Sequence, residues 1–349
     1  MGDIEIGKLG SENESSARQR AVNVSPETLV ATELLRADQT LPLVIRPAAG
    51  KLDTVAWAES NRGFVETHLL KHGALLFRDF NLNTVSEFER FIEALSGELL
   101  EYRERSSPRS QVSGHVYTST DYPANQSIFL HNENSYQRTF PLKLFFYCFV
   151  TPQQGGETPI ADCRKIYQRI DPHIRDRFIQ KKWMYVRNFG DGFGLPWQTV
   201  FQTTDRAIVE EQCRSKGIRV EWKEDNCLRV SAVLPVVVKH PRTGEMSWFN
   251  HATFFHISTL EQSIREVLLE EFEEHDLPTN TFYGDGSSIE NSVLDELREI
   301  YRQEMICFPW RQGDVLMLDN VLTAHGRAPF VGARRILVGM AEPVSREED

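Results

Sequence analysis

Short apolar runs separated by turn-forming residues place the strongest limit on the fold of this chain. Gly, Pro, Asn or Asp flank each run, and the clearest runs are PLKLFFYCFV (141–150), LPVVVKHP (234–241), DVLMLDN (314–320) and RRILVGMA (334–341). This spacing favours a largely antiparallel sandwich or barrel over a sheet built from βαβ units. We therefore predict a mainly β protein with helical insertions, an α+β arrangement.

The remaining segments divide the chain into regions. Residues 1–40 are polar and lack periodicity, so we expect a flexible N-terminal segment before one domain at 41–349. Between about 165 and 305, helical stretches and loops rich in Gly and Pro are expected to form an insertion or lid. Its clearest helices are predicted at 260–275 and 292–303. We expect the first of these to be solvated on one face and to pack an apolar stripe on the core.

The N-terminal half of the domain shows four more elements. We predict strands at 41–47 and 72–80, and helices around 53–70 and at 86–97. In the last helix, apolar residues recur at helical spacing. Ser86 is a plausible N-cap, and Gly97 follows its end.

Composition and charge exclude several classes of function. The 349 residues carry a net charge of −11, and the sequence pI is about 5.5. Binding to nucleic acid or to an anionic membrane surface is therefore disfavoured. No apolar run approaches the roughly 18 residues needed to cross a bilayer, and the N-terminus lacks signal-peptide features, so we expect a cytoplasmic protein. The five cysteines occur singly and predict neither a disulfide framework nor a zinc knuckle.

The segment FLHNENSY (129–136) holds two potential metal ligands. If the apolar run before it continues as a strand, His131 and Glu133 share one face because successive side chains alternate. A His-x-Glu pair alone is weak evidence, since such a pair on a strand more often makes a surface contact.

A third potential ligand, His325, follows the apolar strand DVLMLDN. Two histidines and one carboxylate at neighbouring strand ends form the facial triad that holds non-haem Fe(II) and leaves positions open. Those positions can accept O₂ and an organic acid that chelates iron. The three residues thus predict a metal site with an acid-binding pocket beside it.

An acid bound in this way needs an anchor. Arg334 and Arg335 lie at the start of a predicted strand, so only one of them can face the site. A guanidinium suits this task because its planar fork matches a carboxylate. Thr158, which follows the glycine pair in GGETPIAD (155–162), can supply a hydroxyl to the same carboxylate.

At this point the chain resembles a known group, the taurine dioxygenase and clavaminate synthase superfamily of Fe(II)- and 2-oxoglutarate-dependent oxygenases. The resemblance covers roughly 45–345. Within the superfamily, the chain is similar to the branch that hydroxylates amino acids for nonribosomal peptide antibiotics, typified by the syringomycin-type aspartyl hydroxylases. It rests on HGALLFRDF, FLHNENSY, PQQGGETPIADCR, WFNHATFFHIS, YGDGSSIE and GDVLMLDNVLTAHGRAPFVGARR.

The resemblance implies a double-stranded β-helix, or jelly-roll, core. It implies that His131, Glu133 and His325 bind iron, and that Thr158 and an arginine of the RR pair bind 2-oxoglutarate. Arg334 is preferred on the family pattern, and Arg335 stays open. Because Glu133 is present, oxygen chemistry is implied rather than halogenation.

The implied reaction oxidises an unactivated C–H bond, by hydroxylation or by desaturation, epoxidation or cyclisation, and releases succinate and CO₂. The implied substrate is an amino acid, free or attached to a carrier protein, or a peptide-like small molecule. Two alternatives stay open: a zinc hydrolase that uses the same ligands, and a non-catalytic jelly-roll binding protein.

Several further residues have both a structural and a functional interpretation. Lone histidines are more often hydrogen-bonded than ligating, which applies to His115, His240, His251 and His256. His251 and its neighbour Asn250 are nevertheless candidates to line the pocket. Glycines in NFGDGFGLP, at 190, 192 and 194, predict a flexible lid rather than a phosphate cradle. Arginines at 103, 105 and 109 are either surface charges or contacts to an acidic substrate.

Overall fold

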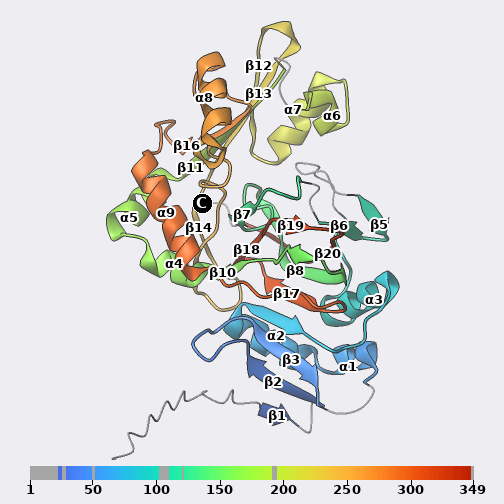
Figure 1. Ribbon diagram of the computed structural model, residues 1–349. Helices are drawn as coiled ribbons and strands as arrows, with labels where there is room; N and C mark the ends of the chain where they lie inside the picture. Colours follow the sequence, from blue (N-terminus) through green and yellow to red (C-terminus); the bar gives the residue numbers. More distant parts are fainter. Residues whose placement is uncertain are drawn as a thin grey trace, which may run out of the picture.

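The structure is a computed structural model, and it describes residues 23–25, 29–48, 52–101, 110–119, 122–190 and 195–346. The predicted lid glycines 192 and 194 and the arginines 103, 105 and 109 lie outside these residues, as do 1–22 of the predicted flexible segment. The main element is a nine-stranded sheet in the order β1-β2-β3-β4-β17-β8-β20-β6-β5 (Figure 1). All its neighbouring strands are antiparallel except β3 and β4.

The strands of the main sheet include three of the apolar runs. Their bounds are β1 Asn23–Ser25, β2 Val30–Leu34, β3 Leu43–Pro47, β4 Ala74–Phe77, β5 Gln111–Ser113, β6 Val116–Thr118, β8 Thr139–Val150, β17 Val315–Asp319 and β20 Arg335–Ser345. Because β2 pairs with β3, the sheet begins N-terminal to residue 41, where we had expected the domain to start.

The interior strand β8 is mostly apolar because both of its faces are covered. Phe145 and Tyr147 pack in a core shared with the N-terminal helices, whereas Leu144 and Phe146 pack in a second core on the opposite face. Alternate side chains of one strand therefore join two separate cores. Phe146 lies on the face that carries the site.

Three helices cover one face of the main sheet: α1 Thr54–Ser60, α2 Arg62–His72 and α3 Val85–Ser96. The predicted helix around 53–70 is thus two helices. The N-cap prediction for α3 was wrong: Thr84, not Ser86, caps the helix in a capping box with Glu87. Gly97 caps the other end with a φ of 76°, as expected from the sequence.

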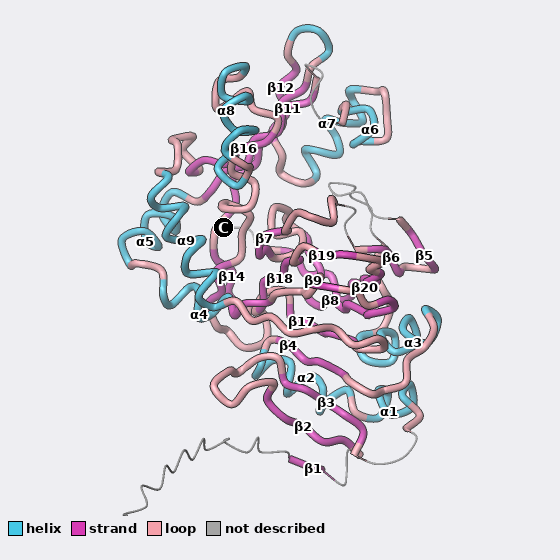
Figure 2. The backbone as a smooth tube through the Cα atoms, viewed as in Figure 1, coloured by secondary structure: helices cyan, strands magenta, loops and turns pink. Residues whose placement is uncertain are grey.

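A smaller sheet faces the other side of the main sheet and completes the jelly roll (Figures 1 and 2). It has the order β10-β18-β7, and a short strand pair lies beside it. The bounds are β7 Ile128–His131, β9 Gln154–Gly155, β10 Ile160–Asp162, β18 Thr323–Arg327 and β19 Phe330–Val331. The strands β7 and β18 carry residues of the site.

The insertion between about 165 and 305 contains a sheet that we did not predict. Its four strands are antiparallel in the order β12-β13-β11-β16, and β14 and β15 form a separate hairpin. The bounds are β11 Trp183–Phe189, β12 Arg219–Trp222, β13 Leu228–Leu234, β14 Val237–Lys239, β15 Met246–Trp248 and β16 Thr279–Tyr283. The run 234–241 therefore belongs to the insertion and not to the jelly roll.

Helices surround this second sheet (Figure 1). The α-helices are α4 Cys163–Arg169, α5 Pro172–Lys181, α6 Trp197–Phe201, α7 Arg206–Ser215, α8 Gln262–Glu271 and α9 Asn291–Glu304, and the 3₁₀ turns are η1 Glu224–Asn226 and η2 Ile257–Thr259. α9 buries Leu294, Leu297 and Tyr301, but α8 has no buried residue. The expected apolar stripe of 260–275 is thus not packed on the core, since Ile264 and Val267 are exposed.

None of the helices in the described part of the chain is long and apolar enough to span a membrane.

Candidate active site

Two neighbouring strands bring the predicted histidines together. His131 is the last residue of β7, and His325 lies directly opposite it on β18 in the antiparallel pairing. Their ring centroids are 4.5 Å apart. The pair is thus set by the register of the two strands.

Glu133 reaches the same place by a different route from the one predicted. β7 ends at His131, and residues 133–136 form a turn, so strand alternation does not explain the position of Glu133. Its Oε2 atom lies 3.8 Å from Nε2 of His325. One potential ligand atom from each of His131, Glu133 and His325 lies within 4.8 Å of the others.

The three side chains fit a divalent metal ion. Glu133 and His325 are buried and His131 is partly buried. The Nδ1 atom of His131 lies 2.8 Å from the carbonyl oxygen of Phe129, which can only accept a hydrogen bond, so this nitrogen carries the proton. Nε2 of His131 then keeps its lone pair, as metal ligation requires. Two imidazoles and one carboxylate match the iron-binding facial triad.

Asn320 holds the backbone of Glu133. The Glu133 N–H donates to Oδ1 of Asn320 at 2.8 Å, and Nδ2 of Asn320 donates to the carbonyl oxygens of Glu133 at 2.9 Å and of Pro141 at 2.8 Å. Asn132 in turn donates from Nδ2 to the carbonyl oxygen of Asn320 at 2.7 Å. Asn320 is fully buried, so these bonds are shielded from water. We missed its role because the contact joins segments that are far apart in sequence.

His240 supports this corner of the site without facing the pocket. Its Nδ1 accepts hydrogen bonds from the backbone N–H groups of Arg242 and Thr243, so Nε2 carries the proton and donates to Asp319 at 2.8 Å. The other oxygen of Asp319 accepts from the N–H groups of Val321 and Leu322. His240 thus has the structural role expected of a lone histidine.

His256 and His115 lie elsewhere. His256 contacts Ser258 through Nδ1, and burial lowers the pKa of His256 to about 4. The backbone N–H of His115 donates to Glu89. Neither belongs to the cluster formed by His131, Glu133 and His325.

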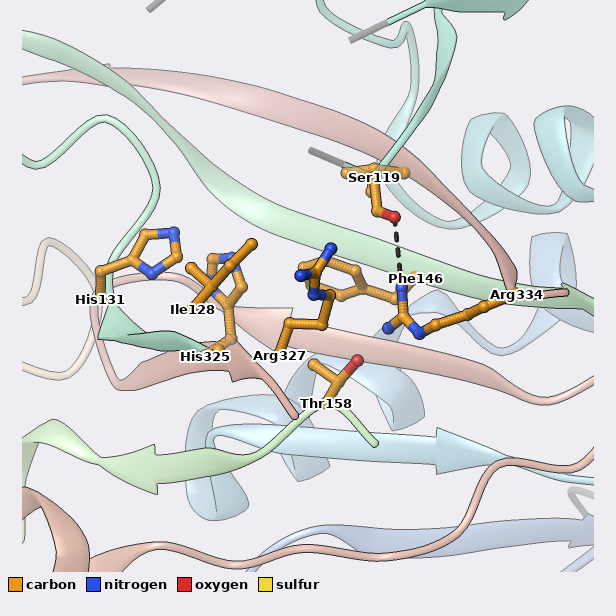
Figure 3. A pocket seen from close by; sticks show the side chains of 10 residues that line it. Ser119, Ile128, His131, Phe146, Thr158, His325, Arg327 and Arg334 are labelled. Atoms are coloured by element: carbon orange, nitrogen blue, oxygen red, sulfur yellow. Dashed lines mark hydrogen bonds between the residues drawn. The ribbon is translucent and has the colours of Figure 1, made fainter. Parts of the chain in front are cut away.

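A pocket extends from the two histidines to Arg334 (Figure 3). Its lining residues come from both layers of the jelly roll: Ser119, Ile128, His131, Phe146, Thr158, His325, Gly326, Arg327, Arg334 and Val338. Figure 3 shows His131 at one end, Arg334 at the other, and Thr158 and Arg327 between them. Metal-binding groups and a cation thus face one space.

The structure separates the two adjacent arginines. Arg334 lines the pocket, donates from Nε to the carbonyl oxygen of Gly156 at 2.8 Å, and donates from Nη1 to Ser119 at 3.3 Å. Burial, with a smaller contribution from the positive charge of Arg327, lowers the pKa of Arg334 to about 10, which leaves it protonated at neutral pH. Arg335 is exposed and lies over the ring of Phe149.

Thr158 and the preceding glycines shape the same end of the pocket. The Thr158 hydroxyl is buried and accepts a hydrogen bond from the Trp310 indole at 3.3 Å. Gly156 has a φ of 72°, and a Cβ there would lie 2.8 Å from Pro152 and 3.0 Å from Cδ of Arg334. Glycine is thus needed for Arg334 to approach this backbone.

Arg327 is a pocket residue that we did not predict. Its guanidinium donates to the carbonyl oxygens of Tyr122 at 2.9 Å, Pro123 at 2.6 Å and Gln126 at 2.9 Å, and so holds this loop beside the pocket. The Phe330 ring lies 5.3 Å from the guanidinium carbon of Arg327 and 5.6 Å from that of Arg334. The position of Arg327, two residues after His325 and on the same strand face, was the only signal in the sequence that Arg327 would line the pocket.

The segment WFNHATFF forms an aromatic wall beside His131. The Phe254 and His251 rings lie 4.6 and 5.5 Å from the His131 ring, between centroids. Burial holds the pKa of His251 well below its usual value, so this ring is neutral, and its Nδ1 is hydrogen-bonded to the Ser135 hydroxyl. Asn250 bonds to the backbone of Val236 and Ala252 instead of facing the pocket.

Comparison with known proteins identifies the family. The family model described as "Taurine catabolism dioxygenase TauD, TfdA family" matches residues 39–341. The chain belongs to the TauD/TfdA family. It is therefore an oxidoreductase of the dioxygenase type.

Two curated relatives of this TauD/TfdA member cover most of its length. The dapdiamide synthesis protein DdaC of Enterobacter agglomerans is 40% identical over 287 residues, which cover 82% of this chain and 87% of that protein. A clavaminate synthase-like protein of Arabidopsis thaliana is 28% identical over 334 residues, which cover 90% and 98% of the two chains.

Solved structures of low sequence identity share the fold. PvcB of Pseudomonas aeruginosa superposes with a TM-score of 0.53 at 16% identity, over 91% of this chain and 92% of that chain. A second PvcB structure, of an "Fe, alpha-ketoglutarate dependent oxygenase from an isonitrile synthetic pathway", gives 0.51 at 16% identity over 91% and 93%. AAD-2 in complex with Mn(II) and N-oxalylglycine gives 0.55 at 15% identity over 91% and 99%. The jelly-roll prediction is thereby confirmed.

Proposed function

We propose that this TauD/TfdA member uses Fe(II), 2-oxoglutarate and O₂ to oxidise an unactivated C–H bond of an amino acid or a peptide-like small molecule in secondary metabolism. One observation carries the proposal: a His-Glu-His cluster and an arginine–threonine pair face the same pocket. A bound metal ion would explain the His-Glu-His cluster, and a dicarboxylate cosubstrate would explain the arginine–threonine pair.

Each group has a defined task in this proposal. His131, Glu133 and His325 hold the metal. The iron and 2-oxoglutarate, when bound, supply the O₂-dependent oxidation of a C–H bond with release of succinate and CO₂. Arg334 and Thr158 bind the distal carboxylate of 2-oxoglutarate, for which the Arg334 guanidinium and the buried hydroxyl are suited.

Apolar side chains of the pocket have a protective task. Ile128, Phe146 and Val338 line the space between the metal cluster and Arg334. They exclude water around the bound cosubstrate, which strengthens the interaction between Arg334 and a carboxylate. The hydrogen bond from His131 to Phe129 fixes the orientation of that ring.

The relatives support an amino-acid-like substrate. DdaC is a dapdiamide synthesis protein, and PvcB comes from an isonitrile synthetic pathway. We propose an amino acid, free or attached to a carrier protein, that binds beside the His251 and Phe254 wall. Hydroxylation is the simplest outcome. Mass spectrometry of the products distinguishes it from desaturation, epoxidation and cyclisation.

An anaerobic titration tests the cofactor assignment. Fe(II) and 2-oxoglutarate added together should give a weak visible absorption band that neither gives alone. Succinate release should then be measured against free and carrier-loaded amino acids, with products read by mass spectrometry. A zinc-supported hydrolysis without O₂, or ligand binding without any turnover, would overturn the proposal in favour of a hydrolase or a binding protein.

A further inference from the structure

Arg346 directly follows β20, and its guanidinium lies among backbone carbonyl groups. Two buried arginines of the described chain pair with carboxylates, Arg78 with Asp314 and Arg298 with Asp295, whereas Arg327 donates to backbone carbonyl oxygens. Among the described residues, no carboxylate pairs with Arg346 in this way. Burial lowers the pKa of Arg346 to about 10, and the side chain therefore stays charged at neutral pH.

The partners of Arg346 come from three separate segments. Nη2 donates to the carbonyl oxygens of Ser135 at 2.8 Å and Phe249 at 3.3 Å, Nη1 donates to Pro235 at 3.3 Å, and Nε donates to Gln137 at 3.4 Å. Only a planar side chain with several donors can reach all four acceptors at once.

Two of these partners lead directly to the proposed metal site. Ser135 lies in the turn that contains Glu133, and its hydroxyl bonds to Nδ1 of His251. Phe249 lies two residues before His251, whose ring packs against His131. Ser135 and His251 are therefore joined twice, once by their own hydrogen bond and once through Arg346 and Phe249.

We infer that Arg346 is a positioning residue that sets the turn containing Glu133 against the wall containing His251 and Phe254. This inference rests on the proposed function. The inference goes beyond that function, because it assigns a role at the proposed metal site to the residue that directly follows β20. A shorter side chain with fewer N–H donors cannot hold the three segments together, and both Glu133 and His251 gain freedom.

Metal affinity is the measurement that separates positioning from simple stabilisation. We expect Arg346→Gln to raise the Kd for Mn(II), titrated anaerobically with 2-oxoglutarate present, by about tenfold or more, the range seen when supporting groups around a metal are removed. Arg346→Lys should give a smaller loss because it keeps the charge but fewer of the hydrogen bonds. Ser135→Ala should also weaken binding, and its effect should not add to that of Arg346→Gln because the two act through one unit.

The matched control is Arg302→Gln, which removes an exposed guanidinium from α9 and should leave the Kd unchanged. If the wild-type protein binds no metal, the proposed function fails. If the wild-type protein binds Mn(II) and a folded Arg346→Gln binds it equally well, the positioning inference is wrong even where the melting temperature falls. If Arg346→Gln does not fold, Arg346→Lys and Ser135→Ala test the inference instead. An unchanged Kd for Mn(II) in both of these variants would overturn it.

Discussion

The two ends of the pocket are built in different ways. At the metal end, His131 and His325 are fixed by strand register, and the backbone of Glu133 is bound on both sides by Asn320. At the arginine end, Arg334 is placed by a glycine turn, a serine hydroxyl and the Phe330 ring. Strand pairing and hydrogen bonds to the Glu133 backbone therefore define the end proposed to bind metal. Contacts of the Arg334 side chain define the end proposed to bind a carboxylate, so the two ends should respond differently to substitution.

The largest expected effect is at the metal end. Glu133→Ala should abolish oxidation in iron-reconstituted enzyme because it removes one ligand and a negative charge that retains Fe(II). Succinate and product formation are measured, since some metal can still bind through the two histidines. Glu271→Ala, on the exposed face of α8, is the control. Unchanged oxidation by Glu133→Ala would exclude the facial triad.

The next effect separates the two arginines. Losing a charge-assisted partner and leaving the opposite charge unpaired costs roughly 3–5 kcal/mol, whereas an exposed arginine contributes within about 1 kcal/mol. Arg334→Ala should therefore raise the 2-oxoglutarate requirement on the order of a hundredfold or more, and Arg335→Ala by less than about tenfold. The concentration dependence of succinate release measures both. Equal, small effects of the two changes would show that the carboxylate binds elsewhere.

Asn320→Ala tests the bonds that hold Glu133. The variant leaves the buried N–H and C=O of Glu133 without these partners, so the free energy of unfolding should fall by about 1–3 kcal/mol. Metal affinity should fall by about 10–100-fold. Once metal is saturating, the 2-oxoglutarate requirement should change little, because Arg334 is untouched. Asn83→Ala, at an exposed position, is the control. If Asn320→Ala showed a large loss of 2-oxoglutarate affinity at saturating metal, the proposed difference between the two ends would be wrong.

Gly156→Ala should give the smallest effect and the opposite pattern. The added Cβ would press on Pro152, Phe330 and Arg334, so the guanidinium should shift. We expect the 2-oxoglutarate requirement to rise by roughly three- to tenfold while the Kd for Mn(II) stays the same. Gly97→Ala is the matched control, because Gly97 also has a positive φ, of 76°, and a Cβ there meets nothing within 4 Å. A weakened metal site in Gly156→Ala would mean that the two ends are coupled.

The sequence predicted which residues lie together in the site better than the reason why they do. His131, Glu133 and His325 could be found from residue types and spacing, but the strand argument for Glu133 was wrong because β7 ends before it. Arg334 and Arg335 could be separated only once the strand faces were known. These features depend on the path of the chain and not on residue type alone.

Contacts between distant segments were beyond the reach of the sequence. Asn320 and Arg346 bind backbone atoms, and backbone acceptors leave no residue pattern from which a partner can be inferred. The second sheet was missed for another reason. Its strand Trp183–Phe189 lies among helices, and we treated the whole region as a helical insertion.

The direct pairing of His131 with His325 has a consequence for how such an enzyme can change over evolution. The whole insertion lies between the two residues in the chain, yet the two histidines are direct partners in the pairing of β7 with β18. A change in the length of an insertion loop that does not contact these strands leaves their register as it is. The surroundings of the histidine pair can therefore vary while the two side chains stay opposite each other.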